Sequence, residues 1–221
     1  HPWEGGEGKV PAQYLISHIE IAKSNIIDRN FENAIKHLEQ AQVYPNNLGE
    51  GKLYGTQEND IQYWLGCAWE GLNNQEKAHY YWKMASRGTS DPGSGMEYND
   101  KQPDQILYQG LALLKLGEKD MAKSRFNKLY DYGEKHIFNE VKIDYFAVSL
   151  PNMLIWDEDL NLRNQLHCRY LMGLGLLGFN QPSKALKHFA FITENDKYHY
   201  GTVIHTRIAE SEEINELIQD W

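Results

Sequence analysis

Two short glycine-rich stretches carry the charged residues of this chain that are best placed to do chemistry. Residues 6–9 and residues 49–52 both read Gly-Glu-Gly-Lys. A phosphate-binding loop has the pattern G-x-x-x-x-G-K-[ST] and follows a strand, which neither stretch does. The stretches are either tight turns that glycine permits, or parts of one polar site. In the second case the residues lining the site are Glu7, Lys9, Glu50 and Lys52.

Aromatic side chains lie close to these charges in the sequence. Trp3, Tyr54 and Tyr63 fall in or beside the same segments, and Trp156 lies in a later one. Aromatic rings beside carboxylates suit a sugar, because its C–H faces stack on rings and its hydroxyl groups donate to carboxylates. The same residue types are enriched at protein interfaces. We favour an interface and keep a glycan site as the alternative.

Catalytic and metal sites are not predicted for this stretch of chain. Glu4 with Glu7, and the run 157–159, are paired carboxylates, but a glycosidase needs two carboxyl groups held about 5–9.5 Å apart. Sequence alone cannot supply that geometry, so we expect no catalysis from this stretch by itself. No H-x-x-x-H or C-x-x-C spacing occurs, so we expect no metal and no cofactor.

Charge and hydropathy exclude two classes of partner. The formal net charge over 221 residues is -9 and no basic stripe is visible, which argues against nucleic acid. No apolar run reaches the ~18 residues that a membrane span needs. Cys67 and Cys168 are expected to be unpaired buried thiols, which favours a cytoplasmic location. The chain starts at His1 without Met, so we expect a piece of a longer protein.

A regular spacing of small and large residues organises the chain. A small residue lies 12 positions before an alanine four times, and a large apolar residue follows each alanine by four positions. Small residues on two antiparallel helices let the backbones approach, and the large side chain fills the space beside them. The pattern therefore predicts four helical hairpins. The four sets are Ala22, Ala34 and Leu38; Gly66, Ala78 and Trp82; Gly110, Ala122 and Phe126; and Gly173, Ala185 and Phe189.

This spacing resembles the tetratricopeptide repeat family over residues 12–192, most clearly at 65–85, where Leu-Gly-x-x-Trp precedes Ala-x-x-x-Trp. The resemblance implies an all-α fold, a right-handed α-solenoid of four hairpins. The four alanines are 44, 44 and 63 residues apart, against about 34 in the family, so the connections carry insertions. We expect one domain, with an N-terminal loop (1–11), repeats (12–45, 59–88, 103–133 and 160–194) and a C-terminal cap (198–221).

The helices themselves can be placed from apolar periodicity and from turn residues. They are expected at 12–28, 31–43, 61–72, 75–86, 106–116, 120–132, 161–177, 183–193, 198–208 and 211–219. A narrower resemblance rests on HPWEGGEGKV, NLGEGKL, YWLGCAWEGL and DYFAVSLPN. These look like the C-terminal repeat region of large uncharacterised bacterial proteins with upstream carbohydrate-enzyme-like β-sandwich modules. That resemblance implies a domain junction before His1.

In the tetratricopeptide family the first helix of each hairpin lines a concave groove. Carrying those positions over, repeat by repeat, places Asp60, Tyr63, Asp104, His167 and Tyr170 in the groove. Leucines and isoleucines fill most of the other groove positions, and some of these are expected to pack against the inserted loops. Family members that bind a peptide's terminal carboxylates use basic residues there. Only Lys23 fits, so that mode is not expected.

The function predicted from the sequence is a repeat module, or scaffold, that mediates protein–protein or interdomain binding. The alternative is the helical part of a carbohydrate-active enzyme, whose inserted loops help to form a glycan site. Expected partners are a protein or an upstream domain of the same chain, with an oligosaccharide as the alternative ligand. The predicted contact residues are Trp3, Glu4, Glu7, Glu50, Lys52, Tyr54, Asp60, Tyr63, Asp104, His167 and Tyr170.

Overall fold

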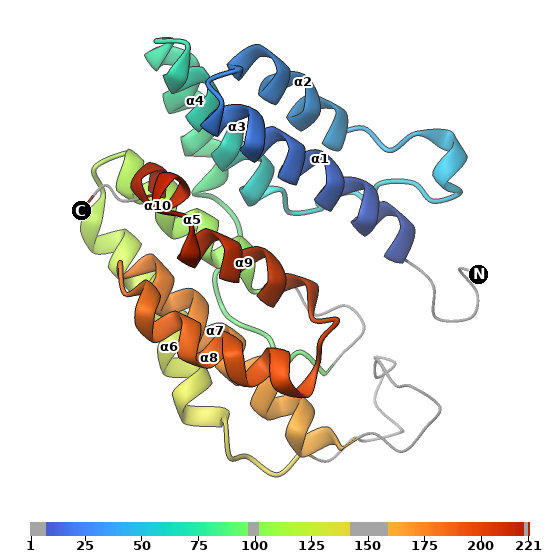
Figure 1. The fold of residues 1–221 in the computed structure, drawn as a ribbon, viewed down its shortest axis with the longest axis vertical. Helices are drawn as coiled ribbons and strands as arrows, with labels where there is room; N and C mark the ends of the chain where they lie inside the picture. The colour runs from blue at the N-terminus through green and yellow to red at the C-terminus, as the bar shows by residue number, and fades with distance from the viewer. Residues whose placement is uncertain (1–7, 97–101, 142–158, 219–220) are drawn as a thin grey trace. The chain divides into compact units, whose positions relative to one another are not determined.

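The computed structural model describes residues 8–96, 102–141, 159–218 and 221. Over these residues the chain forms ten α-helices and one short 3-10 helix, with no strand (Figure 1). The all-α prediction is therefore confirmed. The chain divides into two compact units, His1–Gly88 and Thr89–Trp221, each of which holds two of the predicted hairpins.

The first unit contains the first two hairpins, coloured blue to teal in Figure 1. Helix α1 packs on α2, α3 packs on α4, and both α1 and α2 also contact α3. An extended connection with one 3-10 turn joins the two hairpins. The elements are α1 (Lys9–Ile27), α2 (Phe31–Ala41), the 3-10 turn (Asn46–Leu48), α3 (Asn59–Gly71) and α4 (Gln75–Ala85).

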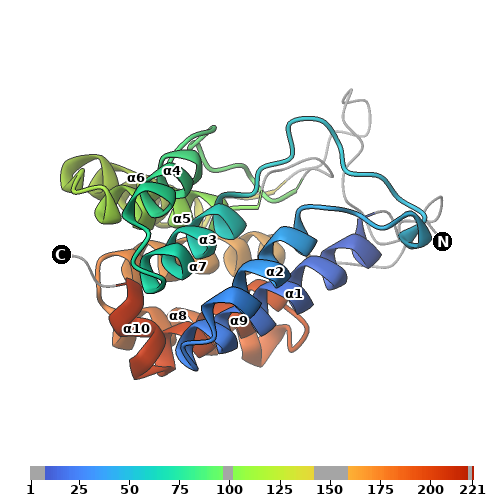
Figure 2. The same ribbon diagram turned by 90° about the horizontal axis from the view of Figure 1, so that it is seen from above.

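The second unit contains the other two hairpins and two terminal helices, coloured green to red in Figure 2. Its hairpins are α5 with α6 and α7 with α8, and α6 packs along α7 to join them. Helix α9 then contacts α7 and α8, and α10 contacts α9. The elements are α5 (Asp104–Lys115), α6 (Lys119–His136), α7 (Leu160–Gly178), α8 (Pro182–Asn195), α9 (Tyr200–Glu210) and α10 (Glu212–Ile218).

The predicted small and large residues meet inside the hairpins. A Cβ added to Gly110 would lie 2.7 Å from Phe126 Cζ, and one added to Gly173 would lie 2.9 Å from Phe189 Cζ. Gly66 faces the ring of Trp82 in the same way. These glycines are needed because only hydrogen fits between the helix backbone and the facing ring.

The turns of the four hairpins also share one backbone feature. Each turn has a residue with positive φ five positions before the hairpin's alanine, where the helix must end in a left-handed conformation. Three of these residues are not glycine, so the shared turn geometry is maintained against their usual backbone preference. They are Arg29 (58°), Asn73 (59°), Gly117 (78°) and Asn180 (56°).

Candidate functional site

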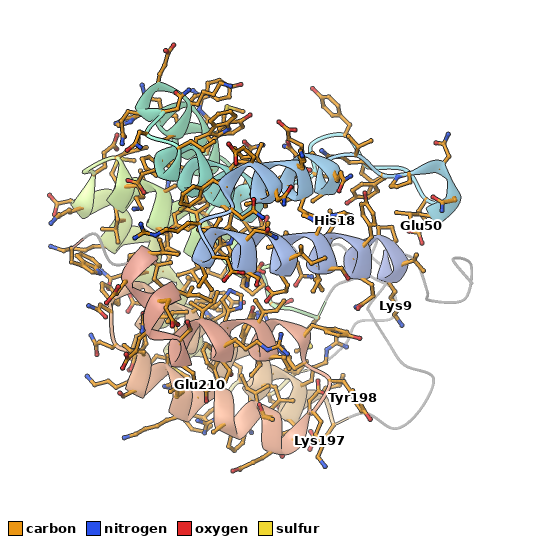
Figure 3. All side chains as sticks on the ribbon, turned by 45° about the horizontal axis from the view of Figure 1, so that its top comes forward. Lys9, His18, Glu50, Lys197, Tyr198 and Glu210 are labelled. Atoms are coloured by element: carbon orange, nitrogen blue, oxygen red, sulfur yellow. The ribbon has the colours of Figure 1, made fainter. Side chains whose placement is uncertain are left out.

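The connection between α2 and α3 brings the second Gly-Glu-Gly-Lys stretch back to the first. The Glu50 carboxylate accepts a hydrogen bond from the Gly8 backbone N–H, with a distance of 2.7 Å from N to Oε2. Figure 3 shows Glu50 on this connection and Lys9 at the start of α1. The two stretches that resemble each other in sequence therefore contact each other in the first unit.

Lys52 closes the base of the same connection. Its Nζ lies 2.6 Å from Glu58 Oε1 and donates to the Gln42 carbonyl oxygen at 3.2 Å. The Gln42 side-chain amide lies 3.4 Å from the other Glu58 oxygen. One lysine therefore joins the residue that ends α2 to the residue that precedes α3.

Tyr44 lies within electrostatic reach of Glu58, Asp60 and Glu50. Burial raises the pKa of its phenol above 10.0, and Glu58, Asp60 and Glu50 raise it further. The phenol therefore stays protonated and can donate, while the carboxylates around it accept. We call Gln42, Tyr44, Glu50, Lys52, Glu58 and Asp60 the loop cluster. It combines hydrogen-bond donors and acceptors from the connection and from the first turn of α3.

The tip of the connection is an ordered turn that displays two apolar side chains. Thr56 closes the turn, because both its N–H and its hydroxyl donate to the Leu53 carbonyl oxygen, at 3.3 and 2.7 Å. Leu53 is 79% exposed and Tyr54 is fully exposed. We call Leu53 and Tyr54 the loop tip. Large exposed apolar side chains on consecutive residues of a closed turn are typical of a contact surface.

A surface hollow of about 490 Å³ opens between α1 and the end of α2. Val43 and Pro45 in its wall flank Tyr44 of the loop cluster. The Tyr14 hydroxyl crosses from α1 and donates to the Gln40 carbonyl oxygen at 3.1 Å. The hollow therefore offers an apolar wall with one charge of each sign at its rim. Its lining residues are Tyr14, Lys36, Glu39, Gln40, Val43 and Pro45.

The predicted contact residues of the first unit fall into three groups. Glu50, Lys52 and Asp60 come together in the loop cluster, and Tyr54 forms part of the loop tip. Tyr63 is instead fully buried, with its ring against Trp64 at a centroid distance of 5.1 Å. Trp3, Glu4 and Glu7 lie outside the described residues, as do Trp156 and the pair 157–158.

In the second unit, His167 binds the chain's own loop. His167 Nε2 lies 2.9 Å from the Gly93 carbonyl oxygen, and Arg163 donates to the Gly95 carbonyl oxygen at 2.9 Å. Lys128 holds the start of the loop through Ser90 at 3.0 Å and through Asp91. Gly93 and Gly95 therefore lie against the face of α7 that was expected to line a groove, and the start of the loop is held by α6.

Tyr170 on the same helix is covered by α9. It is 4% exposed, its hydroxyl lies 3.0 Å from His205 Nδ1, and its ring packs on His199 at 4.8 Å. Asp104 lies in the first turn of α5. The groove positions Leu107, Leu111 and Leu174 are at most 3% exposed. Their side chains are apolar and buried, so they belong to the core; the expected packing of groove leucines against the inserted loops stays a prediction.

Tyr44, Glu58 and Gln42 were missed from the sequence. Each lies next to a helix boundary, where Tyr44-Pro45 ends one helix and Asn59-Asp60 begins the next. The sequence prediction ended one helix at residue 43 and began the next at residue 61, but did not ask which residues the returning chain would bring together. The repeated Gly-Glu-Gly-Lys stretch was the signal that did identify this connection.

The described ranges contain no group of three or more His, Cys, Asp or Glu side chains arranged to hold a metal ion. Within those same ranges, no helix combines the length and the apolar character that a membrane crossing requires. Cys67 and Cys168 are both buried. No protein-family model and no solved structure matches this chain.

Proposed function

We propose that this chain is a tetratricopeptide-like repeat module, a right-handed stack of four hairpins, that binds another polypeptide through the loop tip of its first unit. The observation that carries the proposal is the pair of exposed side chains, Leu53 and Tyr54, on a braced turn. The polypeptide is a separate protein or an upstream domain of the same chain. The module acts by binding and not by catalysis.

The repeat part of the proposal is supported by features that recur at fixed positions. All four hairpins have a left-handed turn residue five positions before the alanine. Three of them place a glycine under the aromatic ring that follows the alanine by four. Unrelated helical pairs would not share both the turn and the packing at the same spacing.

The loop tip suits a polypeptide because it is presented in a fixed conformation. The Lys52–Glu58 ion pair ties the connection to the residue before α3, and the Glu50–Gly8 hydrogen bond ties its middle to the start of α1. A surface that is already ordered loses less conformational entropy on binding. Tyrosine and leucine supply apolar contact area, and the hollow beside Tyr44 provides backbone and charged groups for a polar rim.

A peptide selection tests this proposal. Random peptides displayed on phage are selected on the full chain and measured for affinity by fluorescence anisotropy. We expect selected peptides to bind Tyr54→Ser at least tenfold more weakly, a loss of 1.4 kcal/mol, of the size expected for a central contact. The matched control is Tyr80→Ser, which removes an exposed tyrosine (58%) from α4 of the same unit. Equal affinity for all three proteins would refute a role for the loop tip.

A second candidate function is supported by the loop cluster. The Tyr44 phenol and the carboxylates that raise its pKa offer donors and acceptors for the hydroxyl groups of a sugar, as in the helical part of a carbohydrate-active enzyme. An oligosaccharide panel in a thermal-shift assay tests it. A ligand at 100 times Kd stabilises by about 2.7 kcal/mol, roughly 5–10 °C here. A shift that Tyr44→Phe abolishes would favour the glycan site over the polypeptide site, and a flat panel would exclude it.

A further inference from the structure

Two histidines face each other across the first hairpin. His18 lies on α1 and His37 on α2, and their Nδ1 atoms are 3.0 Å apart. The ring centroids are 5.2 Å apart and the ring planes are inclined by 42°. Both side chains are half-buried, so solvent reaches the pair. Figure 3 shows His18 on the side of α1 that faces α2.

The surrounding residues hold the two rings in place. Ala22 and Ala34 are fully buried between the helices, and small residues there keep the backbones close. Tyr14 packs edge-on against the His18 ring, with centroids 4.4 Å apart. The tyrosine hydroxyl is itself bonded to the Gln40 carbonyl oxygen on α2. Tyr14 is therefore fixed to α2 by its hydroxyl group, and its ring limits the movement of the His18 ring.

We propose that His18 and His37 bind one divalent transition-metal ion through their Nδ1 atoms, with water in the remaining coordination positions. Imidazole nitrogen is a ligand for zinc, nickel and copper. Two nitrogens on one ion are about 3.4 Å apart in a tetrahedral site and about 2.9 Å apart at neighbouring corners of a square plane. The observed 3.0 Å lies within this range, so small ring rotations suffice.

The proton balance of the site is simple. In the metal-free pair one Nδ1–H donates to the other Nδ1. When the metal binds, the donor ring loses its Nδ1 proton and takes one from solvent at Nε2, so a neutral pair changes tautomer without net proton release. Neutral imidazole is the form that binds metals.

Calorimetric titration of the metal-free full chain with Zn²⁺, Ni²⁺ and Cu²⁺ tests the site. We expect one equivalent of at least one ion to bind the wild type, and the signal to be lost in both His18→Gln and His37→Gln. The matched control is His79→Gln on α4, because the His79 ring bonds to a carbonyl of its own helix, Gln75, at 3.0 Å and has the Trp82 ring as its aromatic neighbour. This control should bind as the wild type does. No binding by the wild type, or unchanged binding by either pair variant, would overturn the proposal.

A second measurement tests the site on the wild type, so it remains valid if the histidine variants fail to fold. X-ray absorption spectroscopy of the wild-type complex counts the imidazole ligands on the metal directly. Two are expected, and any other number would overturn the site. The proposal does not depend on the polypeptide-binding function, because its readouts are metal stoichiometry and ligand count in the absence of any peptide.

Discussion

Replacing Gly110 with alanine has two opposite effects on the stability of the fold. Alanine is favoured over glycine in a helix interior by about 1 kcal/mol, so propensity alone predicts stabilisation. The added Cβ would, however, lie 2.7 Å from Phe126 Cζ and 2.9 Å from Cδ1. Overpacking of this kind costs about 1–3 kcal/mol. The balance depends on whether the ring can move.

The ring of Phe126 has little room to move because a second glycine faces it. A Cβ added to Gly178 on α7 would lie 2.6 Å from Phe126 Cγ. The ring is therefore enclosed by backbone from two helices, and Phe126 is fully buried. We place the packing cost of Gly110→Ala near about 3 kcal/mol. After the propensity gain of about 1 kcal/mol, the net loss is about 2 kcal/mol, or roughly 4–8 °C in Tm.

Thermal and urea unfolding of three variants would measure this balance. Gly173→Ala should cost less than Gly110→Ala, since among the described glycines only Gly173 has the Phe189 ring as its nearest neighbour, whereas Gly110 and Gly178 both face Phe126. Gly51→Ala is the control, because a Cβ there meets no atom within 4 Å; its Tm should not fall, and the restricted unfolded chain should raise it slightly. Adding Phe126→Leu to Gly110→Ala should give less destabilisation than the two single changes summed, by about 0.5 kcal/mol or more. A rise in Tm for Gly110→Ala would refute the packing argument.

Three further predictions concern the turns, a thiol and a histidine. At the turn positions, Arg29→Gly should stabilise the fold by up to about 1 kcal/mol and Gly117→Ala should destabilise it by a similar amount, because only glycine adopts positive φ without strain. Urea unfolding measures both changes in stability. If both variants changed stability in the same direction, the shared turn geometry would be contradicted. Burial raises the pKa of Cys168 to about 11, so iodoacetamide at about pH 8 should label it only after unfolding, as mass spectrometry would show; rapid labelling of the native chain would contradict its burial. His199 caps α9 by accepting from the Thr202 N–H at 3.1 Å, and burial lowers its pKa below 6.5; its contribution to stability is therefore present above about pH 6.5 and lost as pH falls through the lowered pKa. His199→Asn keeps a capping acceptor that does not titrate, so its Tm should depend less on pH below about pH 6.5, and an unchanged profile would exclude His199 as the cause.

The hairpins could be predicted from the sequence because their determinants are local. The 12-residue spacing from Gly110 to Ala122, and the four residues on to Phe126, act within a single pair of helices. The contacts of His167 could not be predicted in the same way. Its partner, the Gly93 carbonyl, lies 74 residues earlier in the chain. Whether a loop returns over a helix face depends on the whole unit, and no periodic pattern encodes it.

The loop cluster was predicted only in part, because some of its members are brought together by where the helices end and begin. The repeated motif pointed to Glu50 and Lys52, but the position of Tyr44 follows from where α2 ends and where α3 begins. Tyr63 illustrates the opposite case. Its family position indicated a groove, whereas the observed side chain is fully buried, because an aromatic side chain beside Trp64 gains more from packing than from exposure.

The most direct test of the central claim is amide hydrogen exchange of the full chain, with and without a saturating selected peptide. The account predicts slower exchange on binding at residues 49–58, in the connection that carries the loop tip, and at 40–45 beside the hollow. Helix α4, which carries the control residue Tyr80, should not change. Protection confined to other parts of the chain, with none at 49–58, would contradict the assignment of polypeptide binding to the loop tip.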